Sequence, residues 1–189
     1  MNRRTFHRRA LSATALLALS ACGFSLRQGT HLAFRTITLS GFASSSPLAP
    51  ELARALEASG VDVVETTAQA VAQAQAASAV PGSHASSSHL IFEALADGRQ
   101  QIVASSTAFG QVRDLTLRTK LDFQVLRADG SVLLPRTELL ISHDLTYNEK
   151  DALAKQSESE ALYKAMQSDI VSQVLRRLSV ITPDALAAR

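Results

Sequence analysis

The sequence predicts an α+β fold, a two-layer sandwich with two helices on one face of a mostly antiparallel or mixed β-sheet of about four to five strands. Apolar and polar residues alternate along 115–125, as in a strand with one buried face. Apolar residues recur every four positions along 162–178, as in an amphipathic helix. The predicted order is strand, helix, strand, loop, about three strands and helix, which favours helices gathered on one side of a sheet.

The first predicted elements lie between residues 34 and 64. Phe34 to Leu39 is rich in strand formers, and the turn-rich stretch from Gly41 to Pro50 ends this strand. Glu51 to Ser59 has a short apolar face and predicts a helix that ends at Gly60. Val61 to Val64 then predicts a brief second strand.

A stretch poor in large apolar residues follows, from Thr66 to Ser88. It cannot bury enough apolar area to offset the entropy lost on ordering, so we predict a flexible insertion at 66–88. His84 and His89 flank its end, and histidines in a serine-rich loop are expected to be solvated. We therefore expect no metal site.

The clearest strand runs from Leu115 to Val125. Its apolar parity consists of Leu115, Leu117, Thr119, Leu121, Phe123 and Val125, and the other parity is polar. One face therefore packs on a core, and the other meets water or a partner. Before this strand, Leu90 to Ala96 has strand character, and Asp97-Gly98 indicates a turn within or beside it.

A hairpin is predicted around Ala128-Asp129-Gly130, because Asp-Gly is favoured where both turn residues need positive φ. Its second arm is the apolar run from Ser131 to Ser142. Pro135 lies inside this arm and lacks a backbone N–H, so it belongs on an edge strand or at a bulge.

The last long element is the amphipathic helix. Its apolar face is predicted to contain Leu162, Met166, Ile170, Val174 and Leu178, with Ala165, Val171 and Leu175 beside them. Pro183 follows the helix and leaves a short C-terminal tail at 183–189.

The N-terminal residues have the layout of an exported lipoprotein. Basic residues precede an apolar run from Ala10 to Leu19 that is too short to span a bilayer, so residues 1–21 predict a signal peptide that is removed. Leu19-Ser20-Ala21-Cys22 resembles the lipobox of bacterial lipoproteins. We expect Cys22, the only cysteine, to carry diacylglycerol and an N-acyl chain, with no other cofactor. A buried or reactive thiol is the alternative.

Gly23 favours the outer membrane, since an aspartate there would, by resemblance to the enterobacterial sorting rule, favour the inner membrane. Arg3-Arg4-Thr5-Phe6 also resembles a twin-arginine export signal. Removal of residues 1–21 takes four arginines and no carboxylate, so 15 of the 19 basic residues remain against 17 acidic ones. This balance argues against a nucleic-acid partner. Residues 22–189 fit one domain.

The sequence offers no catalytic constellation. It contains no Gly-X-Ser-X-Gly motif, although His143-Asp144 and many serines are present. Glu158, Glu160 and Asp169 predict a solvated helix face, because no nucleophile or metal-ligand set accompanies them. We predict no enzymatic activity and no catalytic residue.

Several motifs, taken in order, resemble the LptE family of lipoproteins. The run from Cys22 to Arg27, Cys-Gly-Phe-Ser-Leu-Arg, resembles the family's opening, and Gly110-Gln111 resembles its third-to-fourth strand region. The most specific part is Tyr147-Asn148, Ala152-Leu153-Ala154-Lys155, Glu158 and the helix to Leu178. Two departures are the 66–88 insertion and His143, where many relatives carry arginine.

The resemblance implies a protein that plugs the LptD β-barrel, assists its assembly and binds lipopolysaccharide during insertion into the outer leaflet. Lys155 matches a family lysine implicated in lipopolysaccharide binding, in the loop leading into the last helix. Lipopolysaccharide presents phosphates and acyl chains, so it requires cations beside apolar surface. Arg113, Arg118 and Lys120, on or near the polar parity of the long strand, could extend a phosphate-binding strip beside Lys155.

The segment Ser142 to Asn148 is the predicted contact with LptD. It contains His143, with Leu145 and Tyr147 as anchors exposed in a loop. The alternative is that Leu145 and Tyr147 pack onto the sheet. Two other functions also remain open. An outer-membrane lipoprotein could carry apolar ligands or scaffold the envelope without a barrel, and a periplasmic hydrolase would need a pocket with a nucleophile and a base.

Overall fold

The computed structural model describes residues 32–66, 68–69 and 89–187. Its strands are β1 (Thr36–Ser40), β2 (Asp62–Val63), β3 (His89–Ser106), β4 (Val112–Arg127) and β5 (Val132–Thr146). Its helices are α2 (Leu48–Ala58), the 3-10 turn η1 (Glu149–Asp151), α4 (Ala152–Leu178) and α5 (Pro183–Ala187). The predicted insertion at 66–88 lies almost wholly outside the described residues.

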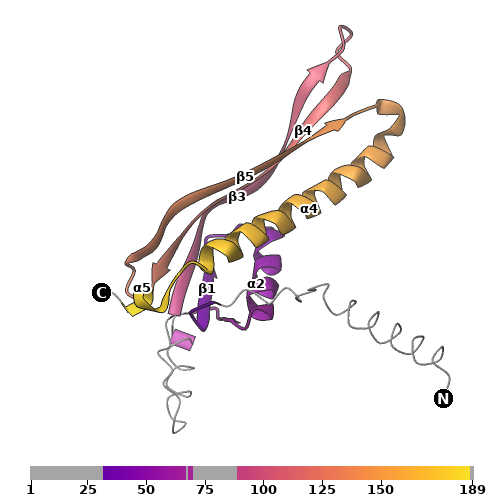
Figure 1. Ribbon diagram of the computed structural model, residues 1–189. Coiled ribbons are helices and arrows are strands. Elements are labelled where there is room, and N and C mark those ends of the chain that lie inside the picture. The colour runs from indigo at the N-terminus through magenta and orange to yellow at the C-terminus, as the bar shows by residue number, and fades with distance from the viewer. Residues whose placement is uncertain (1–31, 67, 70–88, 188–189) are drawn as a thin grey trace, which may run out of the picture.

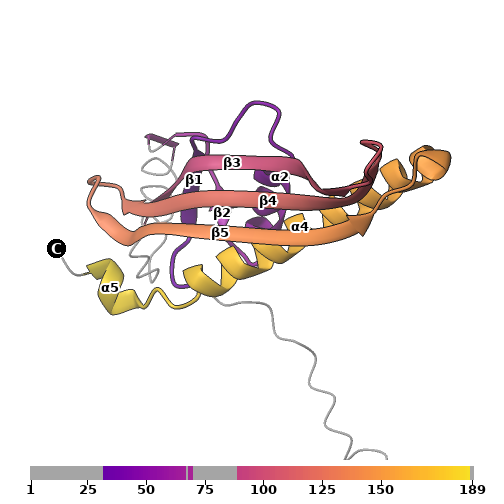
Figure 2. The same ribbon diagram turned by 90° about the horizontal axis from the view of Figure 1, so that it is seen from above.

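The strands form one open, mixed sheet in the order β2-β1-β3-β4-β5. β1 pairs in parallel with β2 and β3, while β3, β4 and β5 form antiparallel hairpins. Figure 1 and Figure 2 show α2 and α4 on the same face of this sheet, and none of the described helices on the other face. The predicted α+β sandwich is therefore confirmed. We name the two sides the helix face and the open face.

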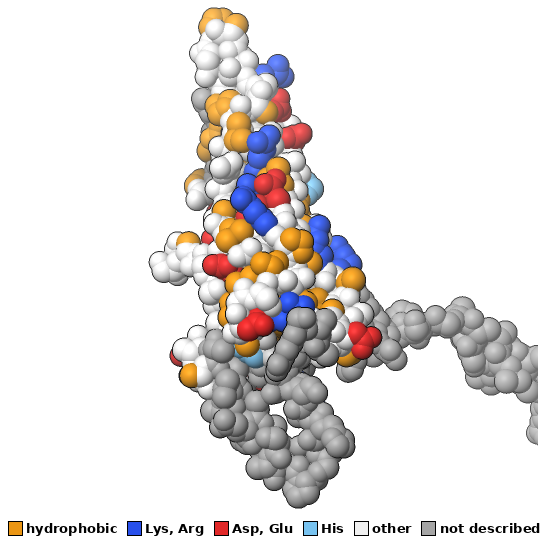
Figure 3. Space-filling view, turned by 90° about the vertical axis from the view of Figure 1, so that its left-hand side faces the viewer, with side chains coloured by type: hydrophobic (Ala, Val, Ile, Leu, Met, Phe, Trp, Pro, Cys, Tyr) orange, Lys and Arg blue, Asp and Glu red, His pale blue; other side chains and the backbone are white. Residues whose placement is uncertain are grey.

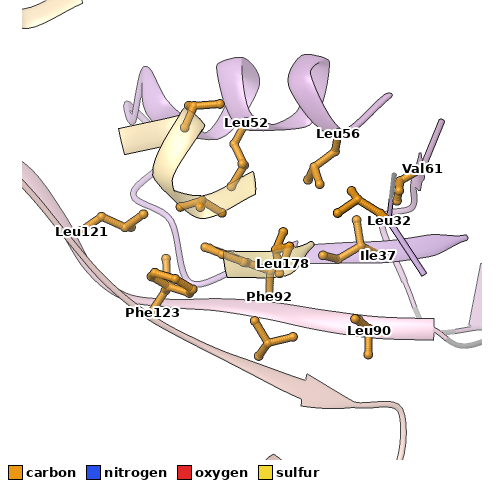
Figure 4. Packing of buried hydrophobic residues seen from close by; sticks show 14 of the residues in the cluster. Leu32, Ile37, Leu52, Leu56, Val61, Leu90, Phe92, Leu121, Phe123 and Leu178 are labelled. Atoms are coloured by element: carbon orange, nitrogen blue, oxygen red, sulfur yellow. The ribbon is translucent and has the colours of Figure 1, made fainter. Parts of the chain in front are cut away.

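The helix face holds the main hydrophobic core. α2 contributes Leu48, Leu52 and Leu56, and it ends as predicted, because Gly60 has a φ of 83° and Val61 N donates to Leu56 O (3.1 Å). The rings of Phe92 and Phe123 stack with 4.7 Å between centroids beneath this helix (Figure 4). Burial of these side chains joins α2, α4 and the sheet.

The alternation predicted for β4 is confirmed. Every residue of its apolar parity from Leu115 to Val125 is buried on the helix face. β5 is an edge strand, and the β4–β5 register shifts between Phe123 and Val125, opposite the Pro135 region. Both situations predicted for Pro135, an edge and a bulge, are therefore present.

β3 differs from its prediction. It runs without a turn from His89 to Ser106, because the pairing with β4 continues through Asp97-Gly98. The irregularity lies just before, where Leu95 is an extra residue between Ala94 and Ala96. The bulge changes which residues of β3 face the helices. Before it, Ala94 pairs with Phe123, and after it, Arg99 pairs with Thr119; Phe123 and Thr119 both lie on the helix face.

α4 also packs differently in detail. Its buried residues are Tyr163, Met166, Gln167, Ile170, Val171, Val174 and Leu178. Of the predicted face, Leu162 is only partly buried and Ala165 is exposed. Tyr163 and Met166 join Leu115, Leu117 and Leu145 in a second, smaller cluster towards the β3–β4 turn. α4 therefore spans both clusters.

Two further expectations need correction. His89 is 8% exposed and therefore not solvated. Its ring nitrogens find partners inside the fold, since Thr36 Oγ1 lies 3.1 Å from Nδ1 and Thr38 Oγ1 lies 3.4 Å from Nε2. The expected tail at 183–189 begins with helix α5, whose Ala185 carbonyl accepts from Arg127 Nη2 (2.9 Å).

Candidate functional site

One end of the molecule brings together the β3–β4 turn, the end of β5 and the start of α4, at the top of Figure 1. Tyr147 N donates to Arg113 O (2.7 Å), which closes the β4–β5 pairing. Asn148 then accepts from Lys150 N through its side chain (3.1 Å) and starts the η1 turn. This short turn leads the chain directly into α4. We call this region the hairpin end.

A hollow of about 390 Å³ lies at the hairpin end. It is lined by Thr107, Gln111, Val112, Arg113, Thr146, Tyr147, Asn148 and Lys150. Arg113 and Lys150 are its charged residues, and none of these lining residues carries a carboxylate. Two cations, hydroxyls and two amides can bind an anion such as a phosphate group. We call it the cationic hollow.

Lys155 lies in the first turn of α4, not in the loop that precedes it. Its Nζ pairs with Glu158 (2.8 Å), and the Lys155 side chain is 25% exposed. No acidic residue lies in the first turn of this 27-residue helix, although Asp151 is its N-cap. The helix N-terminus therefore adds positive potential near Lys150 and Lys155.

Arg118 and Lys120 belong to the other side of the sheet. Both lie on the open face, where they line a second hollow of about 400 Å³ with Gln100 and Glu138. Because the sheet separates this face from α4, they form no continuous strip with Lys155. Of the predicted cations, the hairpin end contains only Arg113 and Lys155.

The charges on the open face are largely paired. Lys120 Nζ lies 2.9 Å from Glu138 and 3.3 Å from Asp122, and hydrogen bonds to these two carboxylates raise the pKa of Lys120. Arg136 donates to Asp122 (2.8 Å), and this bond, together with Lys120, lowers the pKa of Asp122. Lys120 therefore stays protonated, but the neighbouring carboxylates offset its positive charge and leave less attraction for an anionic ligand.

Of the predicted LptD contacts, His143 and Leu145 lie in β5, which continues to Thr146, and Tyr147 directly follows its end. Leu145 is 3% exposed and packs in the smaller cluster, and Tyr147 is half-buried against that cluster. The prediction that both are exposed anchors in a loop is therefore wrong for Leu145. His143 is exposed, as a contact residue needs to be.

Two residues of the site region, Lys150 and Arg99, were not predicted from the sequence. Lys150 carries no periodic signal, although the Asn148 turn could have drawn attention to it. Arg99 follows the β3 bulge, so its side chain reaches α4, where it lies 5.0 Å from the Tyr163 ring centre and bonds Gln167. Tyr163 Oη donates to Gln100 O (2.9 Å), and these contacts hold α4 against β3.

Cys22 and Gly23 lie outside the described residues. Among the described helices, none is long and apolar enough to cross a membrane. The described parts of the chain contain no cluster of three or more side chains suited to bind a metal ion.

Comparisons with known proteins identify relatives. A family profile described as "LptE: Lipopolysaccharide-assembly" matches residues 34–178. The solution structure of an uncharacterized lipoprotein B from Nitrosomonas europaea is 26% identical, with a TM-score of 0.63, and the similarity covers 87% of this chain and 96% of that one. No curated protein sequence matches this chain.

Two crystal structures support the fold alone. Rare lipoprotein B from Shewanella oneidensis is 17% identical, with a TM-score of 0.57 and coverage of 77% of this chain and 95% of that one. The minor lipoprotein from Acinetobacter baumannii is 15% identical, with a TM-score of 0.58 and coverage of 79% and 93%.

Proposed function

The chain belongs to the LptE family of lipopolysaccharide-assembly lipoproteins, and from this premise we propose that it binds lipopolysaccharide at its hairpin end while plugging the LptD β-barrel. The proposed work is binding and positioning, with no catalytic step. The proposed attachment is through an acylated Cys22 to the outer membrane, with the domain facing the periplasm and the barrel lumen.

The observation that carries the proposal is the cationic hollow. Arg113 and Lys150 line it, and Lys155 follows on the adjoining helix. Phosphates of lipopolysaccharide need several cations at once, because a single exposed ion pair contributes little in water. A concave site with two cations and no lining carboxylate suits such a ligand.

The barrel partner is supported by the surface of the domain. His143 is exposed on β5, and the open face presents Arg118, Lys120 and Leu140, with none of the described helices over them. Figure 3 shows basic and acidic side chains interspersed along the molecule, with hydrophobic ones beside them. Surfaces of this mixed kind are typical of interfaces that remain soluble before assembly.

The test compares lysine substitutions along the same helix. We expect Lys155→Asp to weaken binding of purified lipopolysaccharide by roughly 3- to 10-fold, because it replaces an attraction for phosphate by a repulsion. Lys164→Asp is the matched control, since Lys164 is an exposed lysine further along α4. Titration calorimetry gives both affinities, and circular dichroism checks that each variant is folded.

Lys150→Asp should weaken binding like Lys155→Asp, because Lys150 lines the hollow itself. If both variants bind like the wild type, the site is not at the hairpin end. If Lys164→Asp weakens binding equally, the effect reflects overall charge and the assignment also fails.

A further inference from the structure

The apex of the β3–β4 hairpin presents Phe109, whose side chain is 92% exposed. The turn beneath it is well fixed. Gly110 N donates to Thr107 O (2.9 Å) and Thr107 N donates to Gln111 O (2.7 Å), while Thr107 Oγ1 accepts from Phe109 N (3.3 Å) and Gln111 N (3.2 Å). The backbone thus holds a large apolar ring out in solvent.

The second hairpin supplies an internal comparison. The β4–β5 turn has the same backbone pattern, because Gly130 N donates to Arg127 O (2.9 Å) and Arg127 N to Ser131 O (2.9 Å). Gly110 and Gly130 have φ values of 79° and 84°. The other residues of both turns do not have positive φ, so the expectation that Asp129 has positive φ is wrong.

The position of Phe109 in the first turn is that of Asp129 in the second. Asp129 Oδ1 accepts from Ser131 N (2.9 Å), which is how aspartate stabilises such a turn. The turn geometry therefore favours a short polar residue and does not require phenylalanine. An exposed aromatic ring at this position points to contact with something outside the domain.

The surroundings of Phe109 indicate which partner it fits. Thr107 and Gln111, on either side of it in the turn, line the cationic hollow. Other apolar side chains of the region are also uncovered, since Val103 on β3 is 54% exposed and Leu153 at the start of α4 is 83% exposed. Figure 3 shows hydrophobic atoms at the tip of the hairpin and basic side chains below them.

We propose that Phe109 inserts among the acyl chains of a lipopolysaccharide molecule whose phosphates occupy the cationic hollow. This inference rests on the proposed function and adds the apolar half of the site. The order of apolar apex and adjoining cations matches the order of acyl chain and phosphate in such a lipid. Insertion removes the exposed ring from water, which favours the complex.

The chain contains no tryptophan, so one introduced indole reports alone. We expect the fluorescence of Phe109→Trp to shift to shorter wavelength with purified lipopolysaccharide and to stay unchanged with fully deacylated lipopolysaccharide. Asp129→Trp, at the equivalent position of the other hairpin, should show no shift with either. Equal shifts at both positions would overturn the proposal. An equal shift of Phe109→Trp on phosphatidylglycerol vesicles would also overturn it, because general bilayer insertion would then explain the signal.

Affinities separate the apolar contact from the phosphate contact. Phe109→Asn keeps a turn-forming residue without adding a charge beside the hollow, and it should weaken binding of acylated lipopolysaccharide about tenfold, while binding of the deacylated form is unchanged. If wild type binds both forms and Phe109→Asn alters neither, only the apolar contact is wrong. If wild type binds neither form, the proposed function fails and this inference fails with it.

Discussion

His89 begins β3 and is held between two hydroxyl groups of β1, those of Thr36 and Thr38. Hydroxyls can donate or accept, so a neutral imidazole has a partner for each nitrogen. Burial lowers the pKa of His89, and a hydrogen bond with Thr36 opposes this only in part. The folded chain therefore favours the neutral ring.

The lowered pKa predicts a pH dependence of stability. Below about pH 6.5 the unfolded chain takes up a proton on this histidine more readily than the folded chain, so the free energy of unfolding falls as the pH falls. We expect the urea midpoint of the wild type to drop between pH 7.5 and 5.5. His89→Gln removes this titration and should show a smaller drop.

His143→Gln is the matched control, because His143 is exposed on β5. It should keep the pH dependence of the wild type. If His89→Gln loses as much stability over this pH range as the wild type, the buried imidazole is not the cause.

Among the elements, β3 and β4 illustrate what the sequence can predict. β4 alternates because its apolar parity packs in the two hydrophobic clusters beneath α2 and α4. β3 loses this signal after Leu95, where the bulge brings Asp97, Arg99 and Gln101 to the helix face. Arg99 finds polar and aromatic partners there, so no apolar pattern is needed.

The same reasoning explains which residues of the candidate site could be predicted from the sequence. Lys155 was identified through a motif, and Arg113 through its place beside a strongly patterned strand. Lys150 and Phe109 lie in turns, where single residues leave no periodicity. The hollow itself depends on how the β3–β4 turn meets η1, a contact between segments about 40 residues apart that spacing along the chain cannot reveal.

The bulge in β3 also leads to a prediction about stability. Gly41 follows β1 with a φ of 78°, and a Cβ there would overlap the carbonyl oxygen of Ala94, next to the bulge. We expect Gly41→Ala to lower the free energy of unfolding by at least about 3 kcal/mol, since strain and overlap add. Chemical denaturation measures this change.

Gly60→Ala provides the control for strain alone. Gly60 has a similar φ of 83°, but nothing lies within 4 Å of an added Cβ. It should lose only roughly 1 kcal/mol. Equal losses in the two variants would show that the close approach of Gly41 to β3 contributes nothing to stability.

The whole molecule is long, with different properties at its two ends. The main core, with α2 and α5, lies at one end, and the cationic hollow lies at the other, while α4 extends along both (Figure 1). Leu32 and Phe34 are buried in that core, so the described part of the domain begins there. Its first residues therefore lie at the end opposite the proposed lipid site.

The elongated shape leads to a prediction for the proposed barrel partner. A domain that lies along a barrel lumen contacts the wall over much of its length, so the complex should survive mild detergent, unlike attachment through acyl chains alone. We expect the natively acylated protein, purified from solubilised outer membranes, to retain a large β-barrel protein in equal amount, identified by mass spectrometry.

Residues 1–31 fused to an unrelated periplasmic domain supply the same anchor and should retain none. Retention of lipid without a barrel would favour the apolar-ligand carrier, whereas a barrel retained by both baits would mean that the anchor, and not the domain, accounts for the association.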